Sequence, residues 1–377
     1  MGKPEKSDRK SIRELSASVP STDMSSLLSW FWDNHRDLPW RKNRTPYSTW
    51  ISEAMLQQTR VTTVLDYYPR FLERFPSPKA LASATEDEVF KLWEGLGYYS
   101  RARNLMRGAS YICEHFDGEL PSEPDLLLQI PGIGPYMAGA ISSLAFDRPE
   151  PAVDGNCIRI YCRLHALPLI PSEKSTYDEI YSRVSKEIPK DNPGDFNEAL
   201  MDLGSLICTP KSPRCNLCPF SGTCSANLLG KQEDFPVKKP KKETPIEDHT
   251  ILKIYIGEKT LVRKRPDKGL LAGLFELIDL PGILGSHEVE SWLMTNLGIK
   301  KGASDIRPLG ASRHVFSHIR WNMLGYEIHL PDSSTKSSKK STATNNDLTT
   351  RAETLGKLVT PEEYDQLAFA SALRAYR

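Results

Sequence analysis

The stretch Leu127-Leu128-Gln129-Ile130-Pro131-Gly132-Ile133-Gly134-Pro135-Tyr136 sets the expected architecture of the first part of this chain. It joins the end of an apolar helix to the start of another. Gly132 and Gly134 permit close backbone approach and unusual dihedral angles, and Pro135 suits the first turn of a helix. Backbone N–H groups at such a helix start can hold a phosphate oxygen without reading any sequence. Taken alone, the turn is equally compatible with a plain connection between two helices.

Helical patterns flank this turn over residues 24–227. Apolar residues recur at helical spacing in several segments, and proline and glycine separate these segments. The segments are 27–35, 51–71, 88–93 and 136–146. We therefore expect an all-α first domain over residues 24–227.

The pattern changes after residue 227. Residues 228–249 are rich in lysine and proline, which favours a solvated linker over a segment that contacts nucleic acid. Residues 251–262 predict a β-hairpin that turns at Gly257-Glu258. The remainder of the chain has both helical and strand patterns, and we expect a smaller α+β domain over residues 250–377.

Three further segments of that second domain have a predicted structure. Residues 287–297 have a helical pattern. Residues 313–330 predict strand with a turn near Trp321-Asn322. The Ser/Thr/Lys/Asn-rich residues 333–350 indicate a flexible loop.

Composition bounds the class of protein. The 377 residues fit about two domains, 39% of them are apolar, and no run approaches the length of a membrane helix. Residues 1–23 are polar and carry no secretory or transit pattern. We therefore expect no membrane association and a cytoplasmic location, or a nuclear one in a eukaryote. The net charge of +1 gives no global sign of nucleic-acid binding, although a local cationic face still binds DNA.

Four of the seven cysteines crowd into 17 residues. They are Cys208, Cys215, Cys218 and Cys224, spaced C-x6-C-x2-C-x5-C. In a chain expected inside the cell, such clustering favours a metal site over disulfides. Four thiolates suit either zinc or an iron–sulfur cluster. Zinc ribbons usually have two separated C-x2-C pairs, whereas this loop has one.

Two carboxylates are candidates for chemistry in a cleft. Glu53 lies beside an apolar helix face, where by pattern alone a solvated residue is commoner. Asp154, in Val153-Asp154-Gly155-Asn156, is suited to cap a helix, and a capping carboxylate can still present an oxygen to a cleft. Cleavage of a glycosidic bond needs an acid of raised pKa and an anion beside the cationic sugar. Spacing alone does not bring these two residues together.

Several motifs carry a family resemblance. The segment Ser52-Glu53-Ala54-Met55-Leu56-Gln57-Gln58-Thr59 resembles the catalytic signature of the MutY family of adenine DNA glycosylases. Residues 93–103, 153–156 and 197–204 are similar to further signatures of that family. The turn at 127–136 resembles the helix–hairpin–helix of the same superfamily, and the cysteine loop resembles its 4Fe–4S loop. The resemblance implies an all-α helix–hairpin–helix glycosylase domain with an iron–sulfur loop, whose four cysteines hold a 4Fe–4S cluster.

The resemblance also implies a role for each matching residue. Glu53 would protonate adenine at N7 and activate water, and Asp154 would stabilise the cationic sugar by charge or through a covalent intermediate. Tyr136 and Asn156 would support Asp154. The adenine pocket would be lined by Trp40, Arg41 and Glu198. Insertion at the opposite base, which compensates for an extruded nucleotide, would use Gln58, Thr59, Leu96 and Tyr98.

The implied substrate is double-stranded DNA in which adenine is mispaired with 8-oxoguanine or guanine, bound by a monomer. The implied reaction is hydrolysis of the N-glycosidic bond without strand cleavage. Relatives that cut the strand form a Schiff base through a lysine at the second residue after Gly-x-Gly, and Tyr136 cannot form an imine. The first alternative, an endonuclease III-like pyrimidine glycosylase-lyase, is disfavoured by Tyr136 and Glu53. The second, a lesion-binding protein without catalysis, is disfavoured by the presence of Glu53 and Asp154.

The second domain also has a resemblance. Residues 261–276 resemble the start of the MutY C-terminal domain, which has a nucleotide-pyrophosphatase (Nudix) fold. A hydrolase of that fold needs a run of glutamates to bind divalent metal, and residues 287–297 offer only two. We therefore expect a Nudix-like binding module. Its segment Phe316-Ser317-His318, predicted on a strand, resembles the family's motif for oxidised guanine, although alone it also fits an ordinary strand.

Overall fold

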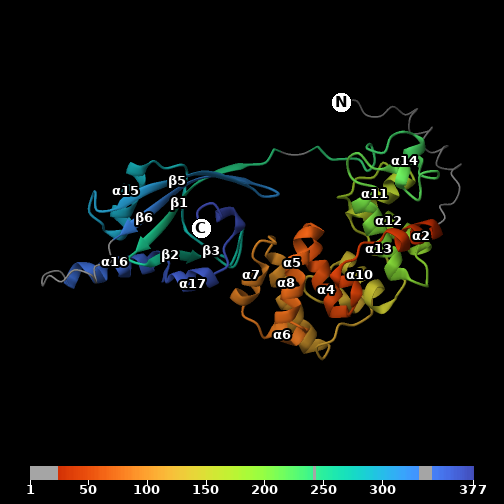
Figure 1. Ribbon diagram of the computed structural model, residues 1–377, viewed down its shortest axis with the longest axis horizontal. Helices are drawn as coiled ribbons and strands as arrows, with labels where there is room; N and C mark the ends of the chain where they lie inside the picture. Colours follow the sequence, from red (N-terminus) through yellow and green to blue (C-terminus); the bar gives the residue numbers. More distant parts are fainter. Residues whose placement is uncertain (1–23, 241–242, 331–341) are drawn as a thin grey trace. The chain divides into compact units, whose positions relative to one another are not determined.

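The computed structural model describes residues 24–240, 243–330 and 342–377. The chain forms two compact units (Figure 1): residues 1–83 with 103–241 make up the first, and residues 84–102 with 242–377 the second. Residues 1–23, where we expect no targeting signal, and residues 331–341 of the predicted flexible loop lie outside the described part. None of the described helices is both long and apolar enough to cross a membrane.

The first unit is built from helices, as the sequence predicts. Its α-helices are α2 (Ser25–Asn34), α3 (Pro39–Lys42), α4 (Pro46–Leu56), α5 (Val61–Arg74), α6 (Pro78–Ala82), α9 (Pro124–Leu127), α10 (Pro135–Phe146), α11 (Gly155–Leu164), α12 (Lys174–Glu187), α13 (Pro193–Leu206) and α14 (Ser225–Leu228). A 3-10 turn, η1 (Cys215–Leu217), lies between α13 and α14. Helix α8 (Ser100–His115) begins in the segment that belongs to the second unit and continues into the first.

Local sequence sets where the functional helices begin. Thr45 and Ser48 form a capping box at the start of α4. Pro135 occupies the first turn of α10, directly after the Gly132–Gly134 turn. Asp154 caps α11, as predicted, and accepts a hydrogen bond from the backbone N–H of Cys157 at 2.7 Å. Helix α10 packs against α4 and α13, and α13 also packs against α11, so these four helices form one packed group.

One predicted helical segment is interrupted. Residues 51–71 divide into α4 and α5, and residues 57–60 form a non-helical connection. Within it Gln58 has a left-handed backbone, with φ 58°, a conformation that a residue other than glycine rarely adopts. Periodicity does not register this break because apolar residues continue on both sides of it.

The second unit is a mixed sheet with flanking helices. Its strands are β1 (Ile246–Ile256), β2 (Lys259–Lys264), β3 (Phe275–Glu276), β4 (Ile278–Pro281), β5 (Asp305–Val315), β6 (Arg320–Leu330) and β7 (Lys357–Val359). The sheet order is β3-β2-β1-β6-β5, with β4 also paired to β1 and β7 to β2. Strands β1 and β6 run parallel along their full length. The helices are α7 (Glu86–Trp93), α15 (Ser286–Leu297), α16 (Thr342–Leu355) and α17 (Pro361–Gln366), and a 3-10 turn, η3 (Ser371–Leu373), follows them.

The predicted hairpin and helix of this unit are confirmed, but two other predictions are wrong. The turn expected near Trp321 lies at residues 316–319, where the N–H of Phe316 donates to the carbonyl of Ile319 at 2.8 Å. Phe316-Ser317-His318 therefore lies in the turn between β5 and β6 and not on a strand. Residues 342–350, which we expected in a flexible loop, belong to α16. Polar composition does not reveal that the backbone of this stretch forms helical hydrogen bonds.

The boundaries between the units differ from those expected at 227 and 250. The segment 84–102 belongs to the second unit. The first part of the expected linker packs against the first unit. Phe235 is buried, and its carbonyl accepts a hydrogen bond from Nε of Arg163 at 3.1 Å. Strand β1 already begins at Ile246 because it pairs with β6 from that residue onward.

Candidate active site

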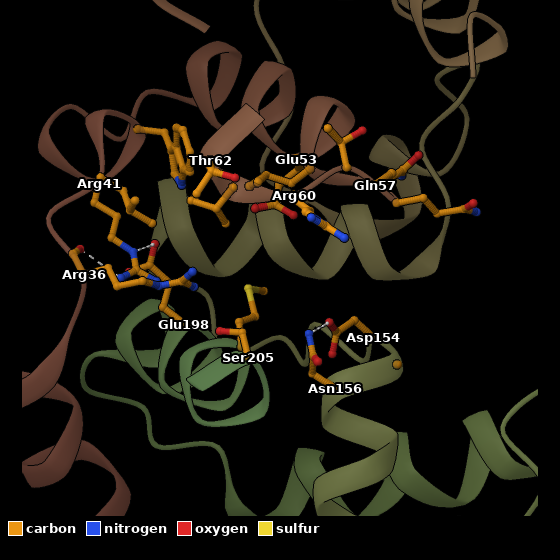
Figure 2. A pocket seen from close by; sticks show the side chains of 18 of the residues that line it. Arg36, Arg41, Glu53, Gln57, Arg60, Thr62, Asp154, Asn156, Glu198 and Ser205 are labelled. Carbon is orange, nitrogen blue, oxygen red and sulfur yellow. Dashed lines mark hydrogen bonds and ion pairs between the residues drawn. The ribbon is translucent and has the colours of Figure 1, made fainter. Parts of the chain in front are cut away.

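A cleft of about 760 Å³ opens in the first unit. It is lined by residues of α3, α4, α10, α11 and α13 and by the connection between α4 and α5. Nine of the twenty site residues expected from sequence line it: Trp40, Arg41, Glu53, Gln58, Thr59, Tyr136, Asp154, Asn156 and Glu198. Figure 2 shows Arg36, Arg41 and Glu198 gathered toward one end of this cleft and Asp154 with Asn156 toward the other.

Glu53 is a buried acid that opens onto the cleft. Its residue is 5% exposed on α4, and the hydroxyl of Tyr136 donates to its Oε2 at 2.5 Å. Burial raises the pKa of Glu53 to about 7, and the charges of Glu198 and Asp154 add to this rise. The Tyr136 hydrogen bond and the charge of Arg41 oppose it. A carboxyl group of this kind is protonated at neutral pH to a useful degree and suits a general acid.

Asp154 is held as a hydrogen-bond acceptor at the start of α11. Besides the N–H of Cys157 it accepts from Nδ2 of Asn156 at 2.7 Å. Burial raises the pKa of Asp154, and these hydrogen bonds oppose the rise because they favour the charged form. The two carboxyl groups of the cleft thus have different surroundings: apolar burial and one phenol for Glu53, and two N–H donors for Asp154.

Arg159 joins Asn156 to the loop that carries the cysteines. Its Nη2 donates to Oδ1 of Asn156 at 2.8 Å and to the carbonyl of Gly204 at 2.7 Å, and its Nε donates to the carbonyl of Cys208 at 2.8 Å. The orientation of Asn156, and through it that of Asp154, is therefore connected to the position of Cys208. No sequence pattern singles out Arg159, because its partners come from separate segments.

The opposite end of the cleft holds a network of arginines and carboxylates. Nε of Arg41 pairs with Oε1 of Glu198 at 3.2 Å, and both side chains are less than 10% exposed. Nη1 and Nη2 of Arg41 donate to the two oxygens of Asp202, at 2.8 and 3.0 Å. Arg36 binds the same carboxylate. Asp202 is not among the predicted site residues, although it lies in the 197–204 motif four residues after Glu198, on the same face of α13.

The four cysteines gather beside the core of the first unit. All are partly buried; burial raises the pKa of Cys218 to about 12, and the charges of Cys208, Cys215 and Cys224 add to this rise. Nη1 of Arg163 lies 3.3 Å from Sγ of Cys208, so a cation faces one thiol. Among the described residues, no three His, Cys, Asp or Glu side chains meet the spacing for a single metal ion. The soft donor set and the adjacent cation are compatible with an anionic iron–sulfur group.

Four other predicted residues lie outside the cleft lining. Gly132 and Gly134 form the turn before α10; Gly132 has φ 87°, and a Cβ there would lie 2.6 Å from Cβ of Asn104. Leu96 and Tyr98 belong to the segment 84–102 of the second unit. Leu96 is buried at 5% exposure, whereas Tyr98 is exposed at 46%. Of these two, only Tyr98 presents its side chain to solvent.

The Phe316-Ser317-His318 turn has an aromatic base. The Phe316 ring meets Trp321 edge-on, with centroids 5.0 Å apart, and also contacts His314 at 4.5 Å. Ser317 and His318 are exposed, and Oγ of Ser317 lies 3.3 Å from Nδ1 of His318. The turn therefore offers two exposed polar side chains beside a fixed aromatic ring.

Comparisons with known proteins agree with this arrangement. Residues 51–187 match the HhH-GPD superfamily of base excision DNA repair proteins, and residues 249–376 match the NUDIX domain. A solved thermostable thymine-DNA glycosylase superimposes with a TM-score of 0.51 at 26% identity, covering 55% of this chain and 95% of that one. The fold and the cleft are thus those of a helix–hairpin–helix DNA glycosylase followed by a Nudix-like domain.

Curated relatives specify the branch. The adenine DNA glycosylase of Rattus norvegicus is 35% identical, with 81% of this chain and 70% of the relative covered. That of Homo sapiens is 34% identical, covering 81% and 66%, and that of Buchnera aphidicola from Schizaphis graminum is 35% identical, covering 81% and 86%. The chain belongs to the adenine DNA glycosylases. It is a DNA N-glycosylase of base excision repair, and a pyrimidine-specific assignment is set aside.

Proposed function

We propose that this chain acts as a monomer that removes adenine mispaired with 8-oxoguanine or guanine and leaves the DNA strand intact. One observation carries the proposal: Glu53 and Asp154 open onto the same cleft, where burial raises the pKa of Glu53 to about 7 and two N–H donors favour the charged form of Asp154. The cleft is lined by a single unit of one chain, which supports a site that needs no second copy.

The residues divide the reaction between them. Glu53 delivers its proton to N7 of adenine, the bond between the base and the sugar breaks, and the bonding electrons leave with the base. The Asp154 carboxylate stabilises the positive charge that develops on the sugar. The Glu53 carboxylate then accepts a proton from the water that adds to the sugar, which restores the acid.

Substitution of Glu53 tests this division. Glu53→Gln keeps the shape of the side chain but cannot deliver a proton, so adenine release in a single turnover should be abolished while DNA binding persists. The matched control is Glu187→Gln, because Glu187 also accepts a hydrogen bond from a tyrosine, Tyr161 at 2.6 Å, and does not line the cleft. Adenine release by Glu53→Gln at the rate of the unsubstituted protein would remove Glu53 from the mechanism.

The absence of strand cleavage rests on Tyr136. Its phenol donates to Glu53 and cannot form an imine with the sugar. Product strands should therefore remain intact until alkali or heat is applied. Efficient borohydride trapping of the protein on its substrate DNA would contradict this part of the proposal.

Cys208, Cys215, Cys218 and Cys224 would hold a 4Fe–4S cluster. Bound there, the cluster would connect the loop after α13 to the start of α14 and would hold them rigidly. It would take no part in the chemistry on the base. Anaerobically purified protein should absorb broadly near about 400 nm, as thiolate-bound iron–sulfur centres do. Zinc in stoichiometric amount without iron, measured by elemental analysis, would rule the cluster out.

The Nudix-like unit would read the base opposite adenine. In support, Ser317 and His318 are exposed in the β5–β6 turn, beside the fixed ring of Phe316. A hydroxyl group there can bond features of 8-oxoguanine, such as its N7–H and O8, that guanine lacks.

A further inference from the structure

We propose that Asp202 is a positioning residue: it holds the Arg41 cation toward Glu198 and away from Glu53, so that the acid keeps its proton. This inference rests on the proposed role of Glu53. Asp202 itself does not line the cleft, and its side chain is fully buried behind Arg41.

The geometry of Arg41 shows how it is held. Both Nη atoms bind the two oxygens of Asp202, and Nη1 also donates to the carbonyl of Arg36 at 3.1 Å. This bidentate pairing fixes the plane of the guanidinium group as well as its position. Nε of Arg41 is the remaining nitrogen of the guanidinium group, and it lies 3.2 Å from Oε1 of Glu198.

Asp202 is itself fixed in place. Arg36 binds it through Nε at 3.0 Å and through Nη2, and the backbone N–H of Arg36 donates to Oδ2 at 3.3 Å. Despite burial, the hydrogen bonds and charges of the two arginines hold the pKa of Asp202 below its usual range. The two arginines thus favour the charged form of Asp202, and its side chain is not exposed to solvent.

Glu198 cannot hold Arg41 in this position alone. Its second oxygen, Oε2, accepts from Nη2 of Arg44 at 2.5 Å, so it offers Arg41 one oxygen only. Arg44 is in turn paired with Asp195. Without Asp202, Nη1 and Nη2 of Arg41 would lose their hydrogen bonds to a carboxylate. The guanidinium group would then be free to turn toward the other carboxyl groups that line the cleft.

Glu53 is the group that such a movement would affect. The four groups with the largest effects on its pKa are Tyr136 on α10, Asp154 at the start of α11, Glu198 on α13 and Arg41 on α3. Two further cations, Arg36 and Arg60, line the same cleft. Arg41 is the only cation among the four groups, and it lowers the pKa of Glu53. A cation that moves nearer strengthens this effect, by about one unit or more at ion-pair distance. Glu53 would then lose its proton at a lower pH.

The test is the pH dependence of single-turnover adenine release. The acid must be protonated, so the rate should fall as the pH rises through the pKa of Glu53. In Asp202→Asn this alkaline fall should move to lower pH by about one unit, which is roughly a tenfold loss of rate at pH 8. Arg41→Lys should also move the alkaline fall to lower pH, because lysine keeps the positive charge but cannot form a bidentate pair with Asp202.

The matched control is Asp195→Asn. It makes the same chemical change on the same helix and also removes an arginine pair, but Asp195 is not among the groups that act on Glu53. Its alkaline fall should stay at the unsubstituted position. Because the stability of the fold also falls as the pH rises, the folded fraction of each variant is measured by circular dichroism at every pH, and the rate is divided by it.

Two failures are distinguishable. If the alkaline fall persists in the residual activity of Glu53→Gln, the assigned acid is wrong, and the proposed mechanism fails first. If Glu53→Gln abolishes release, but Asp202→Asn and Arg41→Lys both keep the unsubstituted alkaline fall, the mechanism stands and the positioning role of Asp202 is overturned.

Discussion

At the scale of single residues, the folded state disfavours the ionised form of Glu53 because the side chain is buried. Its pKa is about 7 in the folded chain against an ordinary 4.5. The folded state therefore binds more protons than the unfolded state between these values, and stability falls as the pH rises from about 4.5 through about 7. Above pH 7 the ionised group costs the fold about 3 kcal/mol.

Glu53→Gln should remove this cost. We expect the variant to be more stable than the unsubstituted protein at pH 8, by an amount of the order of 3 kcal/mol, and to have a much smaller advantage at pH 5. Urea unfolding at the two pH values measures the difference. An equal effect at both would mean that Glu53 is not a buried acid of raised pKa.

Tyr136 acts on the same carboxyl group in the opposite direction to burial. Its hydroxyl donates to Oε2 of Glu53 and lowers the pKa of Glu53. Tyr136→Phe deletes the donor, so the pKa should rise, and the alkaline fall in the single-turnover rate should move to higher pH. This is the reverse of the shift expected for Asp202→Asn. A fall that moves to lower pH in Tyr136→Phe would contradict the assignment.

At the scale of elements, α11 and α13 approach closely because Gly204 has no side chain. A Cβ on Gly204 would lie 2.5 Å from Cβ of Asn156. Gly204→Ala should therefore displace Asn156 and weaken its hydrogen bond to Asp154. One hydrogen bond to a charged group is worth roughly 1.5 kcal/mol, which corresponds to about a tenfold slower release of adenine.

The measurement is the single-turnover rate with DNA affinity as a second readout, since only the rate should change strongly. Gly222→Ala is the control, because a Cβ there meets nothing within 4 Å. Equal rates for Gly204→Ala and Gly222→Ala would show that the contact between the helices does not position Asp154.

At the scale of the whole molecule, we propose that the first unit performs the chemistry and the second recognises the opposite base. Ser317→Ala should reduce the preference for 8-oxoguanine over guanine only a few-fold, because a neutral hydrogen bond contributes about 0.5–1.5 kcal/mol. Ser317→Ala with His318→Ala should reduce it further. The measurement is the ratio of single-turnover rates opposite the two bases, and an unchanged ratio in the double variant would place discrimination elsewhere.

Removing the second unit is a less specific test of the same division. The segment 84–102 packs within that unit: Nζ of Lys91 donates to the carbonyl of Leu367 at 3.3 Å, and the N–H of Phe369 donates to Glu94 at 3.3 Å. A chain that ends at the linker would lose these partners, so we expect it to be destabilised around α7. Point substitutions in the β5–β6 turn avoid this effect.

The sequence by itself determined the order of the two domains, the helix starts at Pro135 and Asp154, the family and nine of the 19 residues that line the cleft. These features depend on local pattern: a capping carboxylate or a proline in a first turn acts on its neighbours along the chain. Only the tertiary structure decided which groups meet. The pKa of Glu53, the link from Arg159 to Cys208 and the fork between Arg41 and Asp202 join residues from separate segments. Desolvation and charge depend on distance in space, and no spacing along the chain encodes that distance.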